Sequence, residues 1–593
     1  MCGIFGIFAK KAVPEKERLV HEAISHMNYR GPDEFGFYED ESMSMAVCRL
    51  SIVDVSGGHQ PHVNDKKTIA VVCNGEIYNH RELRDRLVAK GHQFKTQSDT
   101  EVILHLYEEK KKDLLYDLSG MFAFALWDRE RQALFLGRDR VGIKPLYIYS
   151  DDRIFAFSSE MSTLIGTLNL SADLVPEKVW EFFSYGFPVD NRQTVHRRIR
   201  RLMPGEACMV SGASETFFTY WSPAYMNGGP REGELSLKRV VDLYGRSIRE
   251  HFVSEVPAAV MLSGGLDSTS IALFAHKDGL NLPAVTIGYD GNFPGDERDL
   301  AKEVAGLLDI HIHDICLTYC EYHQAFGELM HFCDEPVADI AAIPQWEIFK
   351  QTRTLGFKVL ENGLGGDEVF YGYGVWNEAS ELFVRGAYQP YFEIDDVSGF
   401  FHHPAYRASR RFLDRCAISC FKAAGKGCDS AICDRFDGES LTGVDRIYHL
   451  LFKTWLPNNC LLLADRLSMA HSIELRVPML DHRLIDYIHS LPQGDRFFGS
   501  KGKVILKNML KDLLPARVID RPKQGFTPPG KYMKEMISAF MEEIFDNKAV
   551  RDFFMEDEMK KHWKDDTYLE IWFRLLVFSR WYHHTFAREG RGR

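Results

Sequence analysis

The chain has 593 residues, of which 45% are hydrophobic and 26% charged, and its formal net charge at pH 7 is −12. A chain of this length is too long for one hydrophobic core, so we expect two or more domains in an ordinary globular protein. The negative charge argues against a nucleic-acid partner, and no stretch approaches the roughly 18–20 apolar residues that cross a bilayer, which argues against a membrane protein.

The twelve cysteines are scattered without a Cys-x-x-Cys pair, which indicates reduced thiols and a cytoplasmic protein. The group Cys416, Cys420, Cys428 and Cys433 has spacings unlike those of zinc ribbons or fingers and contains no histidine, so we expect no metal there. The apolar start of the chain ends at Ala9 and is followed by two lysines, which is not the pattern of a signal peptide.

Residues 1–210 are predicted to form short alternating strands interrupted by two helices. Examples of these strands are 69–73, 122–127, 133–137 and 154–158, with turn residues such as Asn74-Gly75 at their ends. The helices are expected around 15–28 and 80–90. This pattern predicts an α+β layered sandwich.

Residues 211–235 are predicted to be a linker because they contain Asn227-Gly228-Gly229-Pro230. Strands and helices alternate after it, with strands at 258–262, 283–289, 311–316 and 358–361 and helices at about 235–253, from 268 and at 297–308. Repeated strand–helix units predict a parallel, doubly wound sheet in a domain at 236–540. The residues after about 380 look mainly helical, and we expect 541–593 to be a helical tail packed on this domain.

The residue after the initiator methionine is Cys2. Aminopeptidases remove Met ahead of a small side chain, so Cys2 would become the N-terminus and carry a thiol and a free α-amine. The amine, with an ordinary pKa of about 7.7–8.0, can take the thiol proton directly or through one water. The sequence therefore predicts a nucleophilic cysteine.

Two Gly-rich loops follow predicted strands. Ser263-Gly264-Gly265-Leu266-Asp267-Ser268 opens a helix, where backbone N–H groups can surround a pyrophosphate; its alternative is an ordinary turn. Asp367 follows the strand at 358–361 through a second such loop. Strand ends of a doubly wound sheet converge on one crevice, so Asp267 and Asp367 would bridge Mg²⁺ on a triphosphate.

Motifs that run in order along nearly the whole chain resemble one family. The N-terminal motifs are Cys2-Gly3-Ile4, Arg30-Gly31-Pro32-Asp33, Arg49-Leu50-Ser51-Ile52-Val53-Asp54, Asn74-Gly75-Glu76-Ile77-Tyr78-Asn79 and Ser98-Asp99-Thr100-Glu101. The C-terminal motifs are Ser263 to Ser268, Gly365-Gly366-Asp367-Glu368, Glu474-Leu475-Arg476-Val477-Pro478-Met479-Leu480-Asp481 and Lys503. Together they resemble the asparagine synthetase B family of glutamine-hydrolysing amidotransferases.

The resemblance implies an N-terminal nucleophile (class II glutaminase) sandwich in which Cys2 attacks the side-chain amide of glutamine. The oxyanion hole would come from Asn74 and Gly75, and glutamine would be bound by Arg49, Ile52, Glu76 and Asp99. Asn74-Gly75 as a hairpin turn and Arg49 as a surface cation are the alternatives. For Arg30 we favour a structural ion pair near Asp33.

For the second half the resemblance implies a pyrophosphatase-loop synthetase domain that uses ATP and Mg²⁺ to activate a carboxylate as an acyl-adenylate. Lys503 would neutralise charge on the phosphates; a helix-surface lysine is its alternative. Ammonia would cross an internal tunnel, because ammonia in solvent is mostly protonated. The nucleotide would contact Leu262, Ser263, Gly264, Gly265, Asp267, Ser268, Ile287 and Gly363, and the metal would be held by Asp267 and Asp367.

Leu364 departs from the family pattern, which has a glutamate there that is proposed to deprotonate ammonia; leucine has no proton acceptor. The expected reaction is aspartate to asparagine with AMP and pyrophosphate released, and the alternative is another carboxylic acid. Two further alternatives are a cyclase that no longer uses its glutaminase and a storage protein that kept only the fold. The resemblance also implies a homodimer. Residues 380–445 match the family poorly, and we expect them to be either a substrate-specific insertion or a divergent helical region.

Overall fold

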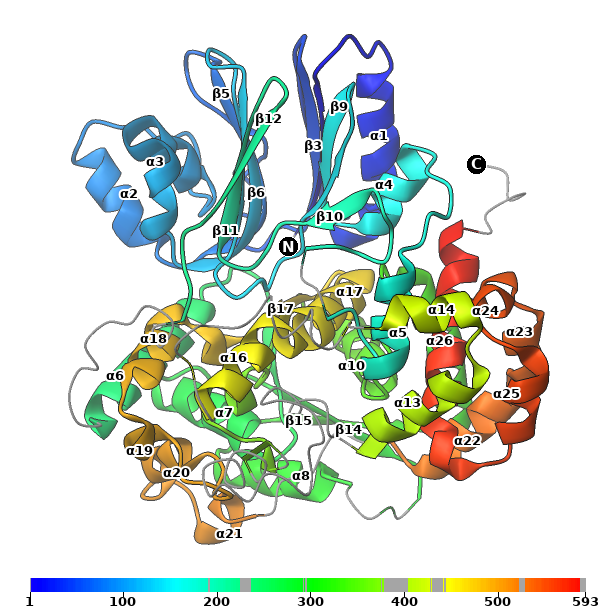
Figure 1. The fold of residues 1–593 in the computed structure, drawn as a ribbon. Helices are drawn as coiled ribbons and strands as arrows, with labels where there is room; N and C mark the ends of the chain where they lie inside the picture. The colour runs from blue at the N-terminus through cyan, green and yellow to red at the C-terminus, as the bar shows by residue number, and fades with distance from the viewer. Residues whose placement is uncertain are drawn as a thin grey trace.

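A computed structural model describes residues 2–189, 192–223, 236–291, 293, 296–374, 376–377, 404–426, 428, 441, 444–521 and 528–586 (Figure 1). The Asn227–Pro230 segment, Cys433 and most of 380–445 therefore lie outside the described residues. No helix within the described ranges is long and apolar enough to cross a membrane.

The N-terminal half contains two antiparallel six-stranded sheets packed face to face (Figure 1). The first has the order β10 (Ile199–Arg201), β8 (Tyr147–Ser150), β9 (Ile154–Ser158), β1 (Cys2–Ala9), β3 (Met43–Arg49), β2 (Glu34–Glu39). The second has the order β12 (Ser214–Thr219), β11 (Glu206–Ser211), β7 (Ala133–Arg138), β6 (Gly120–Asp128), β5 (Ile69–Ile77), β4 (His62–Val63).

Helices cover the outer face of each sheet. Helices α1 (Lys16–His26) and α4 (Met161–Thr167) lie on the first sheet, and α2 (His80–Val88) and α3 (Glu101–Lys110) lie on the second (Figure 1). A buried cluster that includes Ile4, Phe8, Val72 and Trp127 fills the space between the sheets. These four layers confirm the predicted α+β sandwich.

Three details of this half were predicted wrongly. The predicted linker 211–235 contains β12, which pairs with β11 in the second sheet. Helices α3, α4 and α5 (Pro176–Tyr185) were not predicted. Asn74 and Gly75 form no turn, because β5 continues through them to Ile77, with Gly75 paired to Phe122. Gly75 has φ +148°, and a Cβ there would lie 2.0 Å from the Met121 carbonyl oxygen, so this close strand pairing requires glycine.

The second half contains an all-parallel five-stranded sheet with the order β15 (Ile312–Leu317), β14 (Ala284–Tyr289), β13 (Ala258–Met261), β16 (Val359–Glu361), β17 (Glu474–Arg476). The chain winds outward from β13 in one direction and from β16 in the other, which confirms the doubly wound fold. The strand order therefore reverses between β13 and β16, the place where ligands bind in such sheets. The helices of this region are α6 (Leu237–His251), α7 (Leu266–Lys277), α8 (Arg298–Leu307), α9 (Tyr319–Leu329), α10 (Ala342–Thr354) and α11 (Gly366–Val369).

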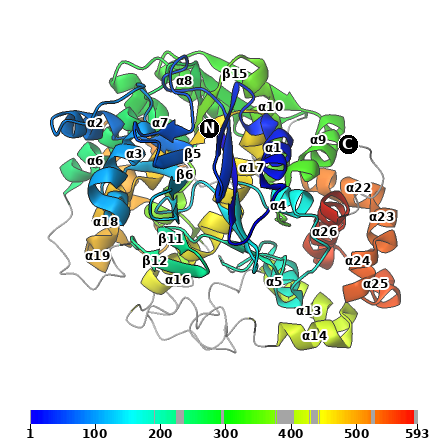
Figure 2. The same cartoon turned by 90° about the horizontal axis from the view of Figure 1, so that it is seen from above.

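The rest of the described chain is helical, apart from β17 and short connections. The helices are α13 (Pro404–Cys416), α14 (Ser419–Gly425), α16 (Val444–Lys453), α17 (Leu462–Ala470), α18 (His482–Ser490), α19 (Gln493–Arg496), α20 (Val504–Leu510), α21 (Ala516–Ile519), α22 (Gly530–Ala539), α23 (Met541–Asp546), α24 (Lys548–Phe553), α25 (Glu556–His562) and α26 (Leu569–Phe586). Figure 2 shows α22 to α26 gathered at one edge of the molecule. Helix α26 also joins the two halves, since Arg574 donates to the carbonyl oxygens of Phe183 (2.8 Å) and Ser184 (2.9 Å) in the N-terminal half.

Buried ion pairs hold the two halves together. Arg30, which is fully buried, contacts Glu160 at 3.2 Å and donates to Asp465 of the second half at 2.9 Å. The predicted partner Asp33 instead pairs with Lys358 at 2.8 Å. Arg30 is thus a structural ion pair, but its partners were predicted wrongly because they lie far away in the sequence.

Candidate active site

Cys2 begins β1, where it pairs in register with Arg49 of β3, and its side chain is buried. Its backbone N–H donates to Oδ1 of Asn74 at 3.0 Å. Burial raises the pKa of the Cys2 thiol, while the Arg49 charge and the Leu50 backbone N–H act in the opposite direction. A buried thiol with a raised pKa needs a base to become a nucleophile.

Asn74 lies beside Cys2 and has an unused donor. Its Nδ2 group is buried and has no hydrogen-bond partner among the described residues, although its Oδ1 is engaged by Cys2. Leaving a buried donor unsatisfied costs about 1–3 kcal/mol, so such a group calls for an explanation. An oxyanion formed on a substrate would supply the missing acceptor.

Two predicted glutamine-binding carboxyls lie close together at this site. Asp99 accepts from the Ile77 backbone N–H at 2.7 Å, and both Asp99 and Glu76 are buried. Burial raises the pKa of Glu76 well above its ordinary value, and the nearby charge of Asp99 raises it further. An ammonium group bound here would relieve this repulsion, which suits the α-ammonium of an amino acid.

Arg49 and Ile52 complete the predicted glutamine site. The Arg49 side chain is buried and donates to the carbonyl oxygens of Val53 (3.0 Å) and Asp54 (2.8 Å), which excludes the surface-cation alternative. Ile52 is buried in an apolar cluster with Val359 of the second half. The structure thus places Arg49 beside Cys2, and it places Ile52 at the contact between the halves.

A cavity of about 620 Å³ lies at the switch point of the parallel sheet. Six of the eight predicted nucleotide-binding residues line it, together with the metal candidate Asp367: Ser263, Gly264, Gly265, Asp267, Ser268 and Gly363. Leu262 and Ile287 are buried and are not among its lining residues. Lys503 and Leu364 also line this cavity.

Lys503 joins the two predicted metal carboxylates. Its Nζ lies 2.5 Å from Oδ2 of Asp267 and 2.7 Å from Oδ1 of Asp367. Burial alone would lower the pKa of Lys503, but the two carboxylates outweigh it, so the pKa is raised and the side chain is a cation. Its backbone φ of +59° is uncommon for a non-glycine residue and marks a constrained position.

The positions of Asp267 and Asp367 also suit a divalent cation. The two carboxylates lie in the first turns of two helices, α7 and α11, yet meet at one cation, the Lys503 ammonium, so a metal ion beside it would find two oxygen ligands. Close packing fixes the loops, because a Cβ on Gly363 would lie 2.7 Å from Cβ of Asp267 and 3.0 Å from the Ser268 nitrogen. The residues present therefore fit Mg²⁺.

A buried charged cluster between the two sites was not predicted. Arg476 on β17 lies 2.6 Å from Glu474 and 4.0 Å from Glu76, and it is in register with Glu361 on β16. Both carboxyl oxygens of Glu361 are buried without a partner among the described residues, and burial raises the pKa of Glu361 to about 8. One available signal was the glutamate that ends the otherwise apolar strand Val359–Glu361.

Residues 1–221 match the family model described as a glutamine amidotransferase domain, and residues 239–583, more than half of the chain, match the one described as asparagine synthase. The chain belongs to the asparagine synthase family. Membership confirms the family that the motifs implied and makes the chain a glutamine-dependent amidotransferase and a carbon–nitrogen ligase.

Curated relatives of the asparagine synthase family match over much of their length. The chain is 29% identical to the glutamine-hydrolyzing asparagine synthetase 1 of Bacillus subtilis (strain 168), covering 98% of this chain and 96% of the relative. It is 29% identical to asparagine synthetase 3 of the same organism, covering 89% and 87%. It is 32% identical to the glutamine-hydrolyzing asparagine synthetase B of Escherichia coli (strain K12), covering 64% and 66%.

Proposed function

We propose that this amidotransferase makes asparagine from aspartate, using glutamine as the ammonia donor and ATP with Mg²⁺ as the activating agents, with AMP and pyrophosphate released. The observation that carries the proposal is that one edge of the parallel sheet adjoins both sites. Arg476 of β17 lies 4.0 Å from Glu76 at the Cys2 site, and β16 runs directly into Asn362, which lines the cavity beside Lys503.

In the glutaminase half, Cys2 would attack the side-chain carbonyl carbon of glutamine once Met1 is removed. The freed α-amine would take the thiol proton and pass it to the leaving ammonia, which leaves a thioester that water hydrolyses to glutamate. The Nδ2 group of Asn74, which has no partner among the described residues, would donate to the oxyanion together with the Gly75 backbone N–H. Arg49 would bind the α-carboxylate, and Glu76 with Asp99 would bind the α-ammonium.

In the synthetase half, the Ser263–Ser268 loop would surround the phosphates of ATP. The loop is already ordered by its own contacts, since Ser263 and Ser268 lie 3.1 Å apart through their hydroxyl oxygens. Asp267 and Asp367 would hold Mg²⁺, which neutralises phosphate charge when bound. Lys503 would stabilise negative charge that develops as the substrate carboxylate displaces pyrophosphate.

Ammonia would pass between the sites along the β16–β17 edge, where Glu361 and Arg476 lie. The enclosed route keeps ammonia away from solvent and so keeps it unprotonated. Glu361, which is largely neutral at pH 7 because its pKa is raised to about 8, would not hold ammonia as tightly as a carboxylate would. The homodimer implied by the family resemblance stays a prediction.

A second candidate is the same chemistry on another carboxylic acid. Leu364 lines the cavity and gives that wall an apolar side chain without a proton acceptor, which favours an acceptor acid with an apolar portion. The glutaminase half would be unchanged. The two candidates differ only in the acid that reacts with ATP.

The deciding experiment measures pyrophosphate release by the Met-processed protein with ATP, Mg²⁺ and glutamine, in the presence and absence of aspartate. The proposal predicts release that depends on aspartate, with asparagine and AMP formed in equal amounts. Glutamine hydrolysis without aspartate-dependent pyrophosphate would reject aspartate and select the second candidate. A panel of carboxylic acids would then identify the substrate.

A further inference from the structure

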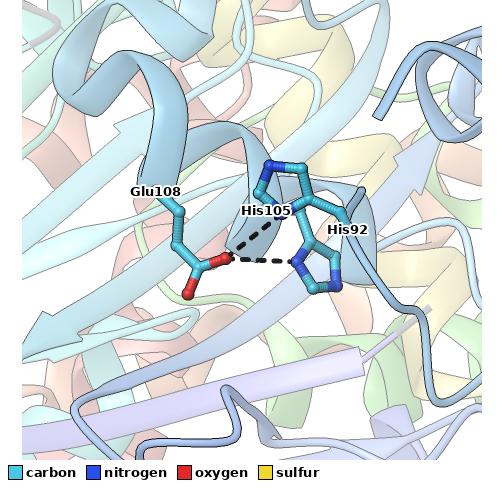
Figure 3. Close-up of side chains that lie close together, drawn as sticks. All are labelled: His92, His105 and Glu108. Carbon is cyan, nitrogen blue, oxygen red and sulfur yellow. Dashed lines mark hydrogen bonds and ion pairs between the residues drawn. The ribbon is translucent and has the colours of Figure 1, made fainter. Parts of the chain in front are cut away.

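Three side chains of the N-terminal half converge at a place that neither active site uses: His92, His105 and Glu108 (Figure 3). One potential ligand atom of each lies within 4.8 Å of the others, and within the described part of the chain no other group of His, Cys, Asp and Glu meets this criterion. His105 and Glu108 are three residues apart on α3 and share one face, and His92 follows α2. We propose that these three side chains bind one divalent transition-metal ion of the zinc type.

The spacing of the potential ligand atoms supports coordination. Nδ1 of His105 lies 3.3 Å from Oε2 of Glu108, and Nδ1 of His92 lies 3.5 Å from the same oxygen. Tetrahedral zinc bonds of about 2.0–2.1 Å place ligand atoms about 3.3–3.4 Å apart. Direct N–H···O hydrogen bonds cluster at about 2.9–3.0 Å, so the observed distances match the edge of a coordination tetrahedron better.

Two of the three potential ligands also have an outer hydrogen-bond partner of the kind found around metal sites. Nε2 of His92 lies 3.3 Å from Oε1 of Glu109. Nε2 of His105 is buried without a hydrogen bond in the described chain, 3.6 Å from Oε1 of Glu101. The second oxygen of Glu108 accepts from Asn64 at 3.0 Å. A carboxylate on the far ring nitrogen of His92 favours the proton on Nε2 and leaves the Nδ1 lone pair for a metal.

The set of ligands defines the class of ion. Two imidazole nitrogens and one carboxylate oxygen suit Zn²⁺, Co²⁺ or Ni²⁺ better than Mg²⁺ or Ca²⁺, which prefer oxygen ligands. The His105 side chain is 8% exposed and that of Glu108 is 30% exposed, so the cluster is buried on one side and open on the other. Solvent can therefore supply the fourth ligand.

The ion would fasten a segment that precedes the glutamine site. Glu101, whose carboxylate lies 3.6 Å from Nε2 of His105, accepts from the backbone N–H groups of Lys95 (2.8 Å) and Thr96 (2.9 Å). Binding at His92 and His105 would thus hold the turn between α2 and α3 onto α3. The expected consequence is a rise in melting temperature on addition of the ion.

The test uses the full-length protein, stripped with a chelator and titrated with Co²⁺ alone. We expect one ion with visible d–d bands and no thiolate charge-transfer band, which separates this site from the cysteines. The variants His92→Gln and His105→Gln should each bind this Co²⁺ at least tenfold more weakly, and Glu109→Gln about 10–100-fold more weakly. His21→Gln is the matched control, because His21 also contacts a glutamate, Glu39, at 3.0 Å, but lies outside the cluster.

The outcomes separate a metal site from a set of ordinary ion pairs. Addition of Zn²⁺ should also raise the melting temperature of the wild-type protein and of the His21→Gln variant. It should not raise that of the His92→Gln variant. The His92 side chain is 18% exposed, against 8% for His105, so we expect its replacement to perturb the fold less and to keep the test decisive if the His105 variant misfolds. The proposal would be overturned if wild-type protein showed no Co²⁺ d–d bands, or showed them only together with a thiolate charge-transfer band. An unchanged Co²⁺ affinity of the His92→Gln variant would also overturn it.

Discussion

The backbone N–H of Cys2 donates a 3.0 Å hydrogen bond to Oδ1 of Asn74, which directs the Nδ2 group of the same amide into a buried position without a partner in the described chain. The packing of β1 against β5 across the sandwich brings Cys2 and the Asn74 side chain together. One amide therefore holds the Cys2 backbone with its oxygen and leaves its nitrogen available to an acceptor.

Replacing Asn74 by Ala should lower kcat for glutamine hydrolysis about 10²–10³-fold, because an oxyanion donor acts in the transition state. The KM for glutamine should change little, since Arg49 and Asp99 remain. Amide formation from added ammonium should match wild type. An unchanged kcat would remove Asn74 from the oxyanion hole.

Replacing Lys503 by Ala should lower pyrophosphate release about 100-fold or more from either ammonia source, because the ammonium that contacts both Asp267 and Asp367 would no longer oppose charge on the phosphates. Glutamine hydrolysis should persist. The matched control is Lys501→Ala, an exposed lysine of the same segment. Equal losses in the two variants would show that Lys503 acts only as a surface charge.

Replacing Gly363 by Ala should abolish ATP-dependent pyrophosphate release and spare glutamine hydrolysis. The new Cβ would meet the Ser268 backbone nitrogen at 3.0 Å and Asp267 Cβ at 2.7 Å, so the phosphate loop must shift. Gly494→Ala is the control, since a Cβ there meets nothing within 4 Å. Normal pyrophosphate release by the Gly363 variant would show that the loop position does not matter.

The buried Glu361 carboxyl should make the free energy of unfolding decrease as pH rises. Its folded pKa is raised to about 8 by burial, above the ordinary value of about 4.5, so the folded state holds a proton that the unfolded state releases between these pH values. Stability from this group is complete below about pH 4.5 and is lost as pH rises towards 8. The effect should reach a few kcal/mol.

The measurement compares urea midpoints of wild type and Glu361→Gln at pH 5.5 and pH 8.5. The glutamine side chain is uncharged at both values, so the variant should lose less stability on going to the higher pH. Parallel pH profiles for the two proteins would contradict the raised pKa.

The sequence predicted elements whose pattern is local. Strands with alternating apolar residues and the loops after them were found, because turn chemistry and strand period act over a few residues. Helix α3 was missed because the stretch from Val102 to Tyr107 is buried all round and shows no amphipathic period. Asn74-Gly75 was expected at a strand end because the pair is a strong hairpin signal, but pairing with β6 overrides it.

Some residues of the candidate site could likewise be predicted from a local pattern, and others could not. Cys2 and the two Gly-rich loops could be predicted, because each carries its chemistry within a short segment. The contact of Arg476 with Glu76, and its register with Glu361, depend on the order of strands and on how the halves pack. The partners of Arg30 depend on the same packing, and no local pattern encodes them.

The proposed function requires Cys2 to supply ammonia to a separate ATP-dependent site in the same chain. The most direct test measures amide formation by Cys2→Ala with glutamine and, separately, with ammonium, beside Cys48→Ala as a control for a buried thiol on the neighbouring strand. We expect Cys2→Ala to lose only the glutamine-dependent reaction and Cys48→Ala to keep both. Loss of both reactions in Cys2→Ala, or retention of both, would rule out this role of Cys2.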